Sequence, residues 1–190
     1  MVTGSYLIDR CDFVINDITG RFMMERIYEF LLCEKDSFVG KGWTLSLFSE
    51  AIIYGDRVEI ILPDNHTETF LKTSEDYHNR RGGTKRLDLK ENETGFCLTE
   101  TSHDRIYQYD KKGKLLWISD RNGNKTRYQY QAGILERISF ASGQYLILTW
   151  QGEKLISMED CIGRRVTYHY ERDLLTQVEM VNGGSRIVWL

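Results

Sequence analysis

The segment Tyr145-Leu-Ile-Leu-Thr-Trp-Gln-Gly-Glu-Lys-Leu-Ile-Ser-Met-Glu-Asp-Cys-Ile-Gly-Arg164 decides the fold that the sequence predicts. Its first six residues are rich in β-branched and aromatic side chains, and an apolar run resumes at Leu155 after a polar turn containing Gly152. A second turn ends at Gly163. Two short apolar runs joined by such turns are typical of an antiparallel hairpin. No copy has an uninterrupted window of about 11 residues with the apolar spacing that a helix needs.

This unit recurs every 20 residues between Arg105 and Leu190. Four columns repeat: glycines 123, 143, 163 and 183; leucines 115, 135, 155 and 175; apolar residues Ile118, Ile138, Met158 and Val178; and the aromatic residues Tyr130, Trp150 and Tyr170, with Tyr109 one residue further from its leucine. A fixed period marks an array of supersecondary units in which each repeat contacts chiefly its neighbours. We therefore predict an all-β, solenoid-like fold in which antiparallel hairpin repeats form a curved continuous sheet.

The two faces of the predicted sheet differ in chemistry. Tyr128 and Tyr130 alternate with Arg127 and Gln129, which makes one face aromatic and the other polar. An aromatic row follows, formed by Tyr107, Tyr128, Trp150, Tyr168, Tyr170 and Trp189. These rings could form a cross-strand ladder that stabilises the sheet, or a surface on which sugars stack. Both interpretations stay open at this point.

The repeat resembles the YD repeats of Rhs proteins. The likeness rests on Tyr128-Gln-Tyr130, on Tyr168-His-Tyr170, and on Tyr107-Gln-Tyr-Asp-Lys-Lys-Gly-Lys-Leu115 followed by Ile118-Ser-Asp-Arg-Asn-Gly123. The family pattern has an aspartate where Asp120 and Asp160 stand, whereas Phe140 and Met180 replace it in two copies. The Tyr-Asp pair itself survives only at Tyr109-Asp110. Period and columns therefore carry the resemblance more than any single dipeptide.

The N-terminal segment carries a second part of this resemblance. Gly20-Arg-Phe22 with Arg26-Ile-Tyr28, and then Val39-Gly-Lys-Gly-Trp-Thr-Leu-Ser46, are similar to the region that precedes the repeats in Rhs proteins. Apolar spacing alone leaves Phe22–Glu34 open between helix and strand. The resemblance favours a strand through Tyr28, followed by a loop or brief helical turn over Phe30–Asp36. In Gly40-Lys-Gly-Trp43 we expect a tight turn that delivers Trp43 into a core.

The remaining segments predict a boundary near residue 104. Residues 1–104 form the N-terminal segment, with short strands at Tyr6–Ile8 and Phe13–Ile15, then Leu45–Tyr54, Arg57–Leu62, Thr67–Lys72, Leu87–Leu89 and Gly95–Glu100. Thr73–Lys85 has no apolar period and predicts an exposed loop. Residues 105–190 hold about four repeats, with a fifth begun at Arg186.

Composition excludes several classes of function. Lys and Arg number 25 against 28 Asp and Glu, a net charge of −3, which gives no field that favours nucleic acid or an anionic membrane. No apolar run reaches the roughly 18 residues of a membrane span, and no signal peptide is recognisable. We expect a chain that is cytoplasmic when made and reaches the cell surface only through a dedicated secretion system. The cysteines 11, 33, 97 and 161 lack the spacing of a zinc site, and we expect small buried thiols without disulfides.

The candidate chemical groups favour turns over catalysis. Ser102, His103 and Asp104 are adjacent in sequence, which is no sign of a hydrolytic triad. Glu153 with Asp160, or Asp110 with Asp120, could form carboxylate pairs for sugar hydrolysis, but each residue sits at a repeat turn where acidic side chains hold the backbone. The histidines 66, 78, 103 and 169 lack metal-ligand spacing. We expect no catalytic, cofactor or metal site.

The resemblance implies a structural function. In Rhs proteins the repeat strip spirals into a hollow shell that encloses a C-terminal toxin domain for delivery into neighbouring cells. The corresponding expectation here is a non-catalytic β-scaffold of a polymorphic-toxin or cell-surface apparatus. Its expected partners are a toxin domain of a longer chain, or a protein or second copy pairing through the open sheet edge near Leu190. The alternative is a carbohydrate- or protein-binding β module at the cell surface.

Overall fold

The computed structural model describes residues 7–46, 48–63, 66–74, 76–80, 87–182 and 185–189. Their regular structure is β-strand apart from one short 3-10 turn, η1 (Phe30–Leu32), so the predicted all-β class is confirmed. The strands are β1(Leu7–Asp17), β2(Gly20–Glu29), β3(Trp43–Leu45), β4(Glu50–Ile53), β5(Arg57–Ile61), β6(Thr67–Lys72), β7(Tyr77–Asn79), β8(Leu87–Glu91), β9(Gly95–Glu100), β10(Arg105–Asp110), β11(Leu115–Ser119), β12(Lys125–Gln131), β13(Ile134–Ser139), β14(Tyr145–Gln151), β15(Lys154–Asp160), β16(Arg165–Glu171), β17(Leu174–Asn182) and β18(Ser185–Trp189).

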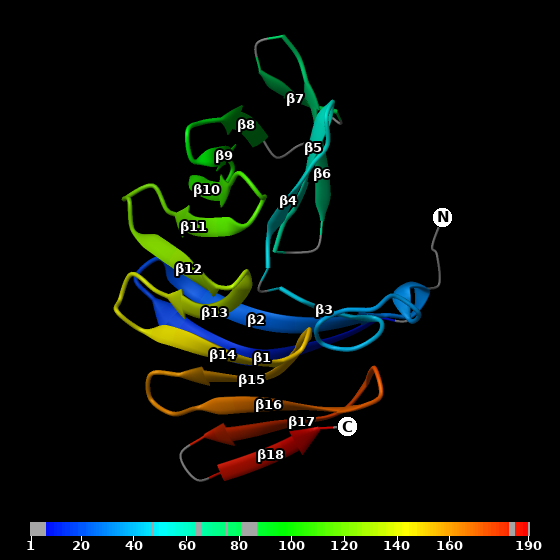
Figure 1. The fold of residues 1–190 in the computed structure, drawn as a ribbon. Coiled ribbons are helices and arrows are strands. Elements are labelled where there is room, and N and C mark those ends of the chain that lie inside the picture. The colour runs from blue at the N-terminus through cyan, green and yellow to red at the C-terminus, as the bar shows by residue number, and fades with distance from the viewer. Residues whose placement is uncertain are drawn as a thin grey trace. The chain divides into compact units, whose positions relative to one another are not determined.

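The strands form two sheets. β1, β2 and β3 make a three-stranded antiparallel sheet, and β4 to β18 hydrogen-bond in chain order as a 15-stranded sheet (Figure 1). The chain divides into two compact units. The first unit joins residues 1–47 to residues 130–190, and the second comprises residues 48–129. The predicted boundary near residue 104 marks where the repeat pattern of the sequence starts. As a domain boundary it stays a prediction.

The 20-residue repeat appears directly in the strand positions. β12, β14 and β16 begin at residues 125, 145 and 165, and β13, β15 and β17 begin at residues 134, 154 and 174. The strand register shifts just before the aromatic residue of a hairpin, so that Trp150 pairs with Leu155 and Tyr170 with Leu175. Tyr109 pairs with Leu115 after the same shift. The aromatic and leucine columns of the sequence therefore mark a recurring β-bulge.

The two faces of the repeat strands alternate as the sequence predicts. Tyr128, Val166 and Tyr168 are buried, whereas Arg127 and His169 are exposed. In the first unit the apolar face packs against the N-terminal segment. The Phe22 and Phe140 rings lie 4.9 Å apart edge to face, and those of Phe38 and Trp150 lie 5.8 Å apart.

The N-terminal segment is a long hairpin followed by a loop. The strand predicted through Tyr28 is confirmed as β2, and η1 supplies the predicted helical turn. The two short strands expected at the beginning are one strand, β1, which bulges between Cys11 and Phe13; Tyr6 lies outside the described residues. Gly20 closes the hairpin with a φ of +116°, which a residue with a side chain rarely adopts.

The strand predicted over Leu45–Tyr54 is wrong. β3 ends at Leu45 in the three-stranded sheet, and β4 begins at Glu50 in the other sheet. Two serines explain why the strand is interrupted between β3 and β4, because the side chain of each forms a hydrogen bond with a group that is distant in the sequence. The amide of Glu25 donates to the Ser46 hydroxyl at 2.8 Å, and in the second unit Ser49 shares a hydrogen bond with the Tyr109 hydroxyl at 2.7 Å.

The exposed loop predicted over Thr73–Lys85 contains a strand, β7. Tyr77 is buried there, and its ring lies 6.0 Å from that of Phe96, edge to face. A three-residue strand with one inward side chain is too short to show a period in the sequence. Residues 81–85 of the predicted loop lie outside the described residues. Phe70, Leu89, Leu98 and Tyr109 are fully buried in this second unit.

Candidate functional site

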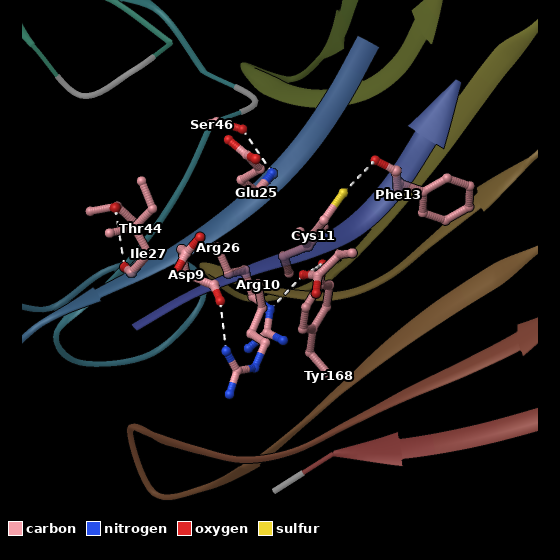
Figure 2. A network of polar contacts seen from close by, with 12 residues as sticks. Asp9, Arg10, Cys11, Phe13, Glu25, Arg26, Ile27, Thr44, Ser46 and Tyr168 are labelled. Carbon is pink, nitrogen blue, oxygen red and sulfur yellow. Dashed lines mark hydrogen bonds and ion pairs between the residues drawn. The ribbon is translucent and has the colours of Figure 1, made fainter. Parts of the chain in front are cut away.

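A buried polar cluster joins the N-terminal sheet to the repeats within the first unit. Arg26 of β2 donates from Nε to Asp12 Oδ2 at 2.5 Å, and Tyr168 of β16 donates from its hydroxyl to the same oxygen at 2.7 Å. The exposed fractions of Asp12, Arg26 and Tyr168 are 2%, 3% and 1%. Figure 2 shows Arg26 and Tyr168 approaching each other from the two layers. We call these three residues the Asp12 cluster.

The bulge in β1 makes this cluster possible. Cys11 pairs with Glu25 and Phe13 with Met24, so Asp12 is the extra residue between them. A bulge redirects a side chain and interrupts strict alternation. Asp12 and Phe13 are therefore both buried although they are neighbours in the strand. Arg10 pairs directly with Arg26, which places two cations side by side.

Burial dominates the electrostatics of the cluster. It raises the pKa of Asp12, although the hydrogen bond and charge of Arg26 and the hydrogen bond of Tyr168 act in the opposite direction. Burial, followed by the charge of Asp12 and its hydrogen bond, raises the pKa of Tyr168 well above its ordinary value. The phenol therefore stays protonated and donates its hydrogen bond to Asp12.

A small pocket adjoins Arg26. Its volume is about 80 Å³, and it is lined by Ile8, Arg10, Arg26, Trp43, Leu175, Thr176, Gln177 and Val178. The Arg26 guanidinium carbon lies 4.9 Å from the centroid of the Trp43 ring. Trp43 is only half-buried, so the expectation that the glycine turn delivers it into a core is wrong. The turn itself is present, with positive φ at Gly40 and Gly42, and it sets Trp43 at the rim of this pocket.

The aspartates of the repeats hold turns, as the sequence predicts. In each case one carboxylate oxygen accepts the amides two and four residues further along the chain. The pairs are Asp110 with Lys112 and Lys114, Asp120 with Asn122 and Asn124, and Asp160 with Ile162 and Arg164. The side chain of Asn124 and the adjacent backbone amides lower the pKa of Asp120.

One of the two copies without this aspartate obtains a carboxylate from elsewhere. Phe140 occupies the position, and the backbone turn from Phe140 to Gly143 is kept. The amide of Ser142, which corresponds to Asn122 and Ile162, donates at 2.7 Å to Asp17 Oδ1. Asp17 is the last residue of β1, next to the hairpin turn that leads to β2 of the same unit. Its carboxylate thus replaces the missing one across 125 residues of chain.

The proposed carboxylate pairs do not come together. Asp110 and Asp120 lie at opposite ends of β11, and Glu153 and Asp160 at opposite ends of β15. A strand rises about 3.3 Å per residue, so the members of each pair are separated by well over about 10 Å. Glycosidase carboxylates stand about 5 to 9.5 Å apart. In each pair the two carboxylates therefore belong to different turns and do not share a site.

Ser102, His103 and Asp104 form an exposed turn, as expected. The histidine is oriented by a buried glutamate that the sequence reasoning missed. His103 Nδ1 lies 2.8 Å from Glu100 Oε1, and the Tyr107 hydroxyl donates to Glu100 Oε2 at 3.1 Å. The Ser102 hydroxyl is also within hydrogen-bonding distance of Nδ1, at 3.1 Å. Because serine and carboxylate share one ring nitrogen, the imidazole cannot relay a proton between them as a triad does.

Two of the other three imidazoles lie beside a glutamate. His66 Nε2 is 3.0 Å from Glu68 Oε1, and His169 Nε2 is 3.8 Å from Glu179 Oε2. Across the described ranges, no group of three histidine, cysteine or acidic side chains is placed to hold a metal ion. The cysteines are free, but the expectation of buried thiols is wrong: Cys11 and Cys161 are exposed, and Cys33 and Cys97 are half-buried. Cys11 sits before the bulge and Cys161 within a turn, where strand alternation no longer sets burial.

The aromatic row is mostly buried. Tyr107, Tyr128 and Tyr168 are inaccessible, and the indole of Trp150 donates to the carbonyl of Leu135 at 2.7 Å. The hydroxyl of Tyr170 donates to the carbonyl of Leu155 at 2.6 Å. The rings do not form a ladder that is confined to one sheet, because Trp150 and Tyr168 contact the N-terminal segment. The Trp189 side chain lies outside the described part of the chain.

One comparison with known proteins yields a match. A family model described as "Domain of unknown function (DUF6531)" matches residues 1–70, a segment that contains β1 to β5, the beginning of β6, the bulge in β1 and the glycine turn. No curated protein matches the chain. Among the residues that the structure describes, no helix has the length and apolar character needed to cross a membrane.

Proposed function

We propose that this chain is a non-catalytic β-scaffold, similar to the N-terminal part of an Rhs-type shell that encloses and helps deliver a toxin domain. The observation that carries the proposal is the use of the acidic side chains. Asp12, Asp17, Asp110, Asp120 and Asp160 each accept hydrogen bonds that fix a turn or join two layers. These carboxylates stabilise the strip and are not assembled for chemistry.

The sequence resemblance supplies the rest of the proposal. The first unit combines an N-terminal sheet with repeat hairpins of the YD type, which is the combination expected where a shell begins. An Rhs-type shell consists of many such repeats, and the cargo is a domain of the same polypeptide. The proposed partner is therefore covalently linked, and the open sheet edge near Leu190 would continue into further hairpins. Leu190 itself lies outside the described residues.

The test is the size and protease resistance of the native product in the source cells. An antibody raised against this chain should detect a polypeptide several-fold longer than 190 residues. Within it, a downstream domain should resist a protease that digests the same domain when it is expressed alone. A product of the size of this chain would contradict a shell and favour an autonomous protein. A larger product with an unprotected downstream domain would contradict enclosure.

The alternative is a surface module that binds carbohydrate or protein, and one observation favours it. On the polar face of the repeats, half-buried rings lie beside cations: Lys125 Nζ is 3.8 Å from the Trp117 ring, and the Arg137 guanidinium carbon is 3.8 Å from the Tyr145 ring. Aromatic faces near polar groups can stack on sugars. Binding on an oligosaccharide array that Trp117→Ala or Tyr145→Ala abolishes would support this function over the scaffold.

A further inference from the structure

We propose that the pocket beside Arg26 binds a carboxylate on a short aliphatic stem, either a free acid or the side chain of a glutamate or aspartate in a peptide. This binding site is independent of the scaffold function. The pocket lies within the first unit, between β1, β2, β3 and β17. Its key residues are Arg10, Arg26, Trp43, Leu175 and Gln177. We refer to it as the Arg26 pocket.

The first argument is an incompletely satisfied guanidinium. Arg26 is buried, yet the bond from its Nε–H to Asp12 is the one hydrogen bond that its side chain makes with the described residues. Guanidinium carries five N–H groups, so the four on Nη1 and Nη2 have no hydrogen-bond acceptor among the described residues. Leaving buried donors unpaired is costly. The group lines the pocket, where an incoming acceptor can reach it.

The second argument is charge. Arg10 and Arg26 are cross-strand partners, and like charges in that position repel. Asp12 provides one negative charge next to Arg26, so the lining retains one positive charge in excess. The Arg10 guanidinium donates to its neighbour, the carbonyl of Asp9, at 2.8 Å and is exposed. A single bound anion would neutralise the pair and accept from both arginines.

The third argument is shape, which selects a carboxylate among anions. The pocket volume of about 80 Å³ is several times the roughly 10–15 Å³ that one water requires, but it is small for a larger ligand. Guanidinium matches the planar carboxylate with two parallel hydrogen bonds. Ile8, Leu175 and Val178 provide an apolar wall for a methylene stem. Gln177 offers an amide that has no partner in the described part of the chain and can donate to the second oxygen.

A second β-bulge lies in the part of the pocket lining that the repeats provide. Tyr170 pairs with Leu175 and His169 with Gln177, so Thr176 is the bulged residue of β17. Its hydroxyl donates to the carbonyl of His169 at 3.2 Å and is therefore turned toward β16. A bulge bends its strand and re-aims side chains. Both bulged residues thus adjoin Arg26, Asp12 as its hydrogen-bond partner and Thr176 as a fellow residue of the pocket lining.

The experiment is a titration of the whole chain with propionate, followed by ¹H–¹⁵N spectra at constant ionic strength. The Arg26 Nε–H and Trp43 indole N–H resonances should shift and saturate with propionate, and should not do so with an equal concentration of chloride. Gln177→Glu places a carboxylate in the pocket and should weaken propionate binding at least about tenfold through like-charge repulsion. Gln151→Glu, the same change at an exposed position of β14, should leave binding unchanged.

A second variant distinguishes a loss of carboxylate binding from misfolding of the first variant. Arg10→Gln removes an exposed charge without touching the Asp12 cluster and should also weaken binding. Acetyl-Gly-Glu-Gly-amide, compared with its Gln counterpart, distinguishes the sources: tighter binding than propionate assigns the pocket to a peptide side chain, and weaker binding assigns it to a free acid. No saturable shift with either carboxylate, or equal binding by Gln177→Glu and Gln151→Glu, would overturn the proposal.

Discussion

At the scale of single residues, Asp12 has the most demanding environment in the first unit. Its carboxylate is buried with one cation and one phenol, and taking charges out of water costs free energy that good geometry only partly returns. Asp17 is the opposite case, because it is only half-buried and its stabilising effect comes from the amides whose hydrogen bonds it accepts. The two aspartates therefore respond differently to substitution and to pH.

Asp12→Ala should lower the free energy of unfolding by about 3–5 kcal/mol, because it leaves the Arg26 charge buried without its partner. Replacing the whole cluster by Asp12→Leu, Arg26→Met and Tyr168→Phe should recover most of that loss, since no charge then remains buried. Urea unfolding at neutral pH measures both. Asp88→Ala, which removes an exposed partner of Lys90, is the control and should cost no more than about 1 kcal/mol. A triple variant as unstable as the single one would contradict this account.

Asp17→Asn should destabilise the protein in a pH-dependent way. Burial alone would raise the pKa of Asp17, but the hydrogen bonds from Ser142 and Thr19 outweigh it and lower that pKa to about 2. A folded-state pKa below the unfolded value of 3.8 means that the ionised carboxylate stabilises the fold above about pH 4. This contribution is lost as the pH falls toward 2.

The measurement for Asp17 is the melting temperature of the wild type and of Asp17→Asn from pH 7 to pH 2. The gap between the two should be constant above about pH 4 and should close near pH 2. Asp36→Asn changes an exposed aspartate of the loop after η1 and serves as the control for general charge effects. A gap that widens on acidification would show that the hydrogen bonds to Ser142 and Thr19 do not govern Asp17.

At the scale of the element, the hairpin with its two turns is the part of the fold that the sequence predicts well. Its signals are local: alternating apolar residues, a glycine and an aspartate at fixed offsets. Where this local pattern is interrupted, the residue concerned contacts a partner that is distant in the sequence. Asp12 and Tyr168 are 156 positions apart, and neither neighbourhood hints at the other. For the same reason the split between β3 and β4, and the exposure of Cys11 at a bulge, could not be predicted from the sequence.

Two glycines at positive φ provide a matched test of how turns dock. At Gly113 a Cβ would lie 1.7 Å from the carbonyl oxygen of Ala51, whose amide donates to Gly113 O at 2.8 Å. At Gly123 no atom lies within 4 Å. Gly123→Ala should therefore cost only about 1–2 kcal/mol for the left-handed backbone. Gly113→Ala should cost about 1–3 kcal/mol more, because the added methyl displaces β4.

Urea unfolding of the two glycine variants checks this difference, and circular dichroism shows whether strand content is kept. The two positions have similar φ values, +87° and +81°, so backbone strain cancels in the comparison. Equal losses of stability would mean that the turn at Gly113 is free to move away from β4. In that case the turn at Gly113 would not be docked firmly in the second unit.

At the scale of the whole molecule, the first unit is built from two segments that are remote in sequence. Strands β1 to β3 cover the apolar face of the repeats, and polar links join the two at several points, among them Lys154 Nζ to the Ser37 carbonyl at 2.9 Å and Arg164 Nη2 to the Val14 carbonyl at 3.1 Å. Neither segment buries its apolar face alone. The two segments should therefore gain and lose structure together, as one cooperative unit.

Hydrogen exchange followed by mass spectrometry tests this cooperativity in the intact chain. Asp12→Ala should speed exchange in β14, β15 and β16 as much as in β1 and β2, because opening the Asp12 cluster uncovers both layers. Amides of β5, β6 and β9, which belong to the second unit, should change less. Faster exchange confined to β1 and β2 would show instead that the repeats hold their structure without the N-terminal sheet. In that case Asp12 would fix the position of the hairpin and contribute nothing to the stability of the strip beneath it.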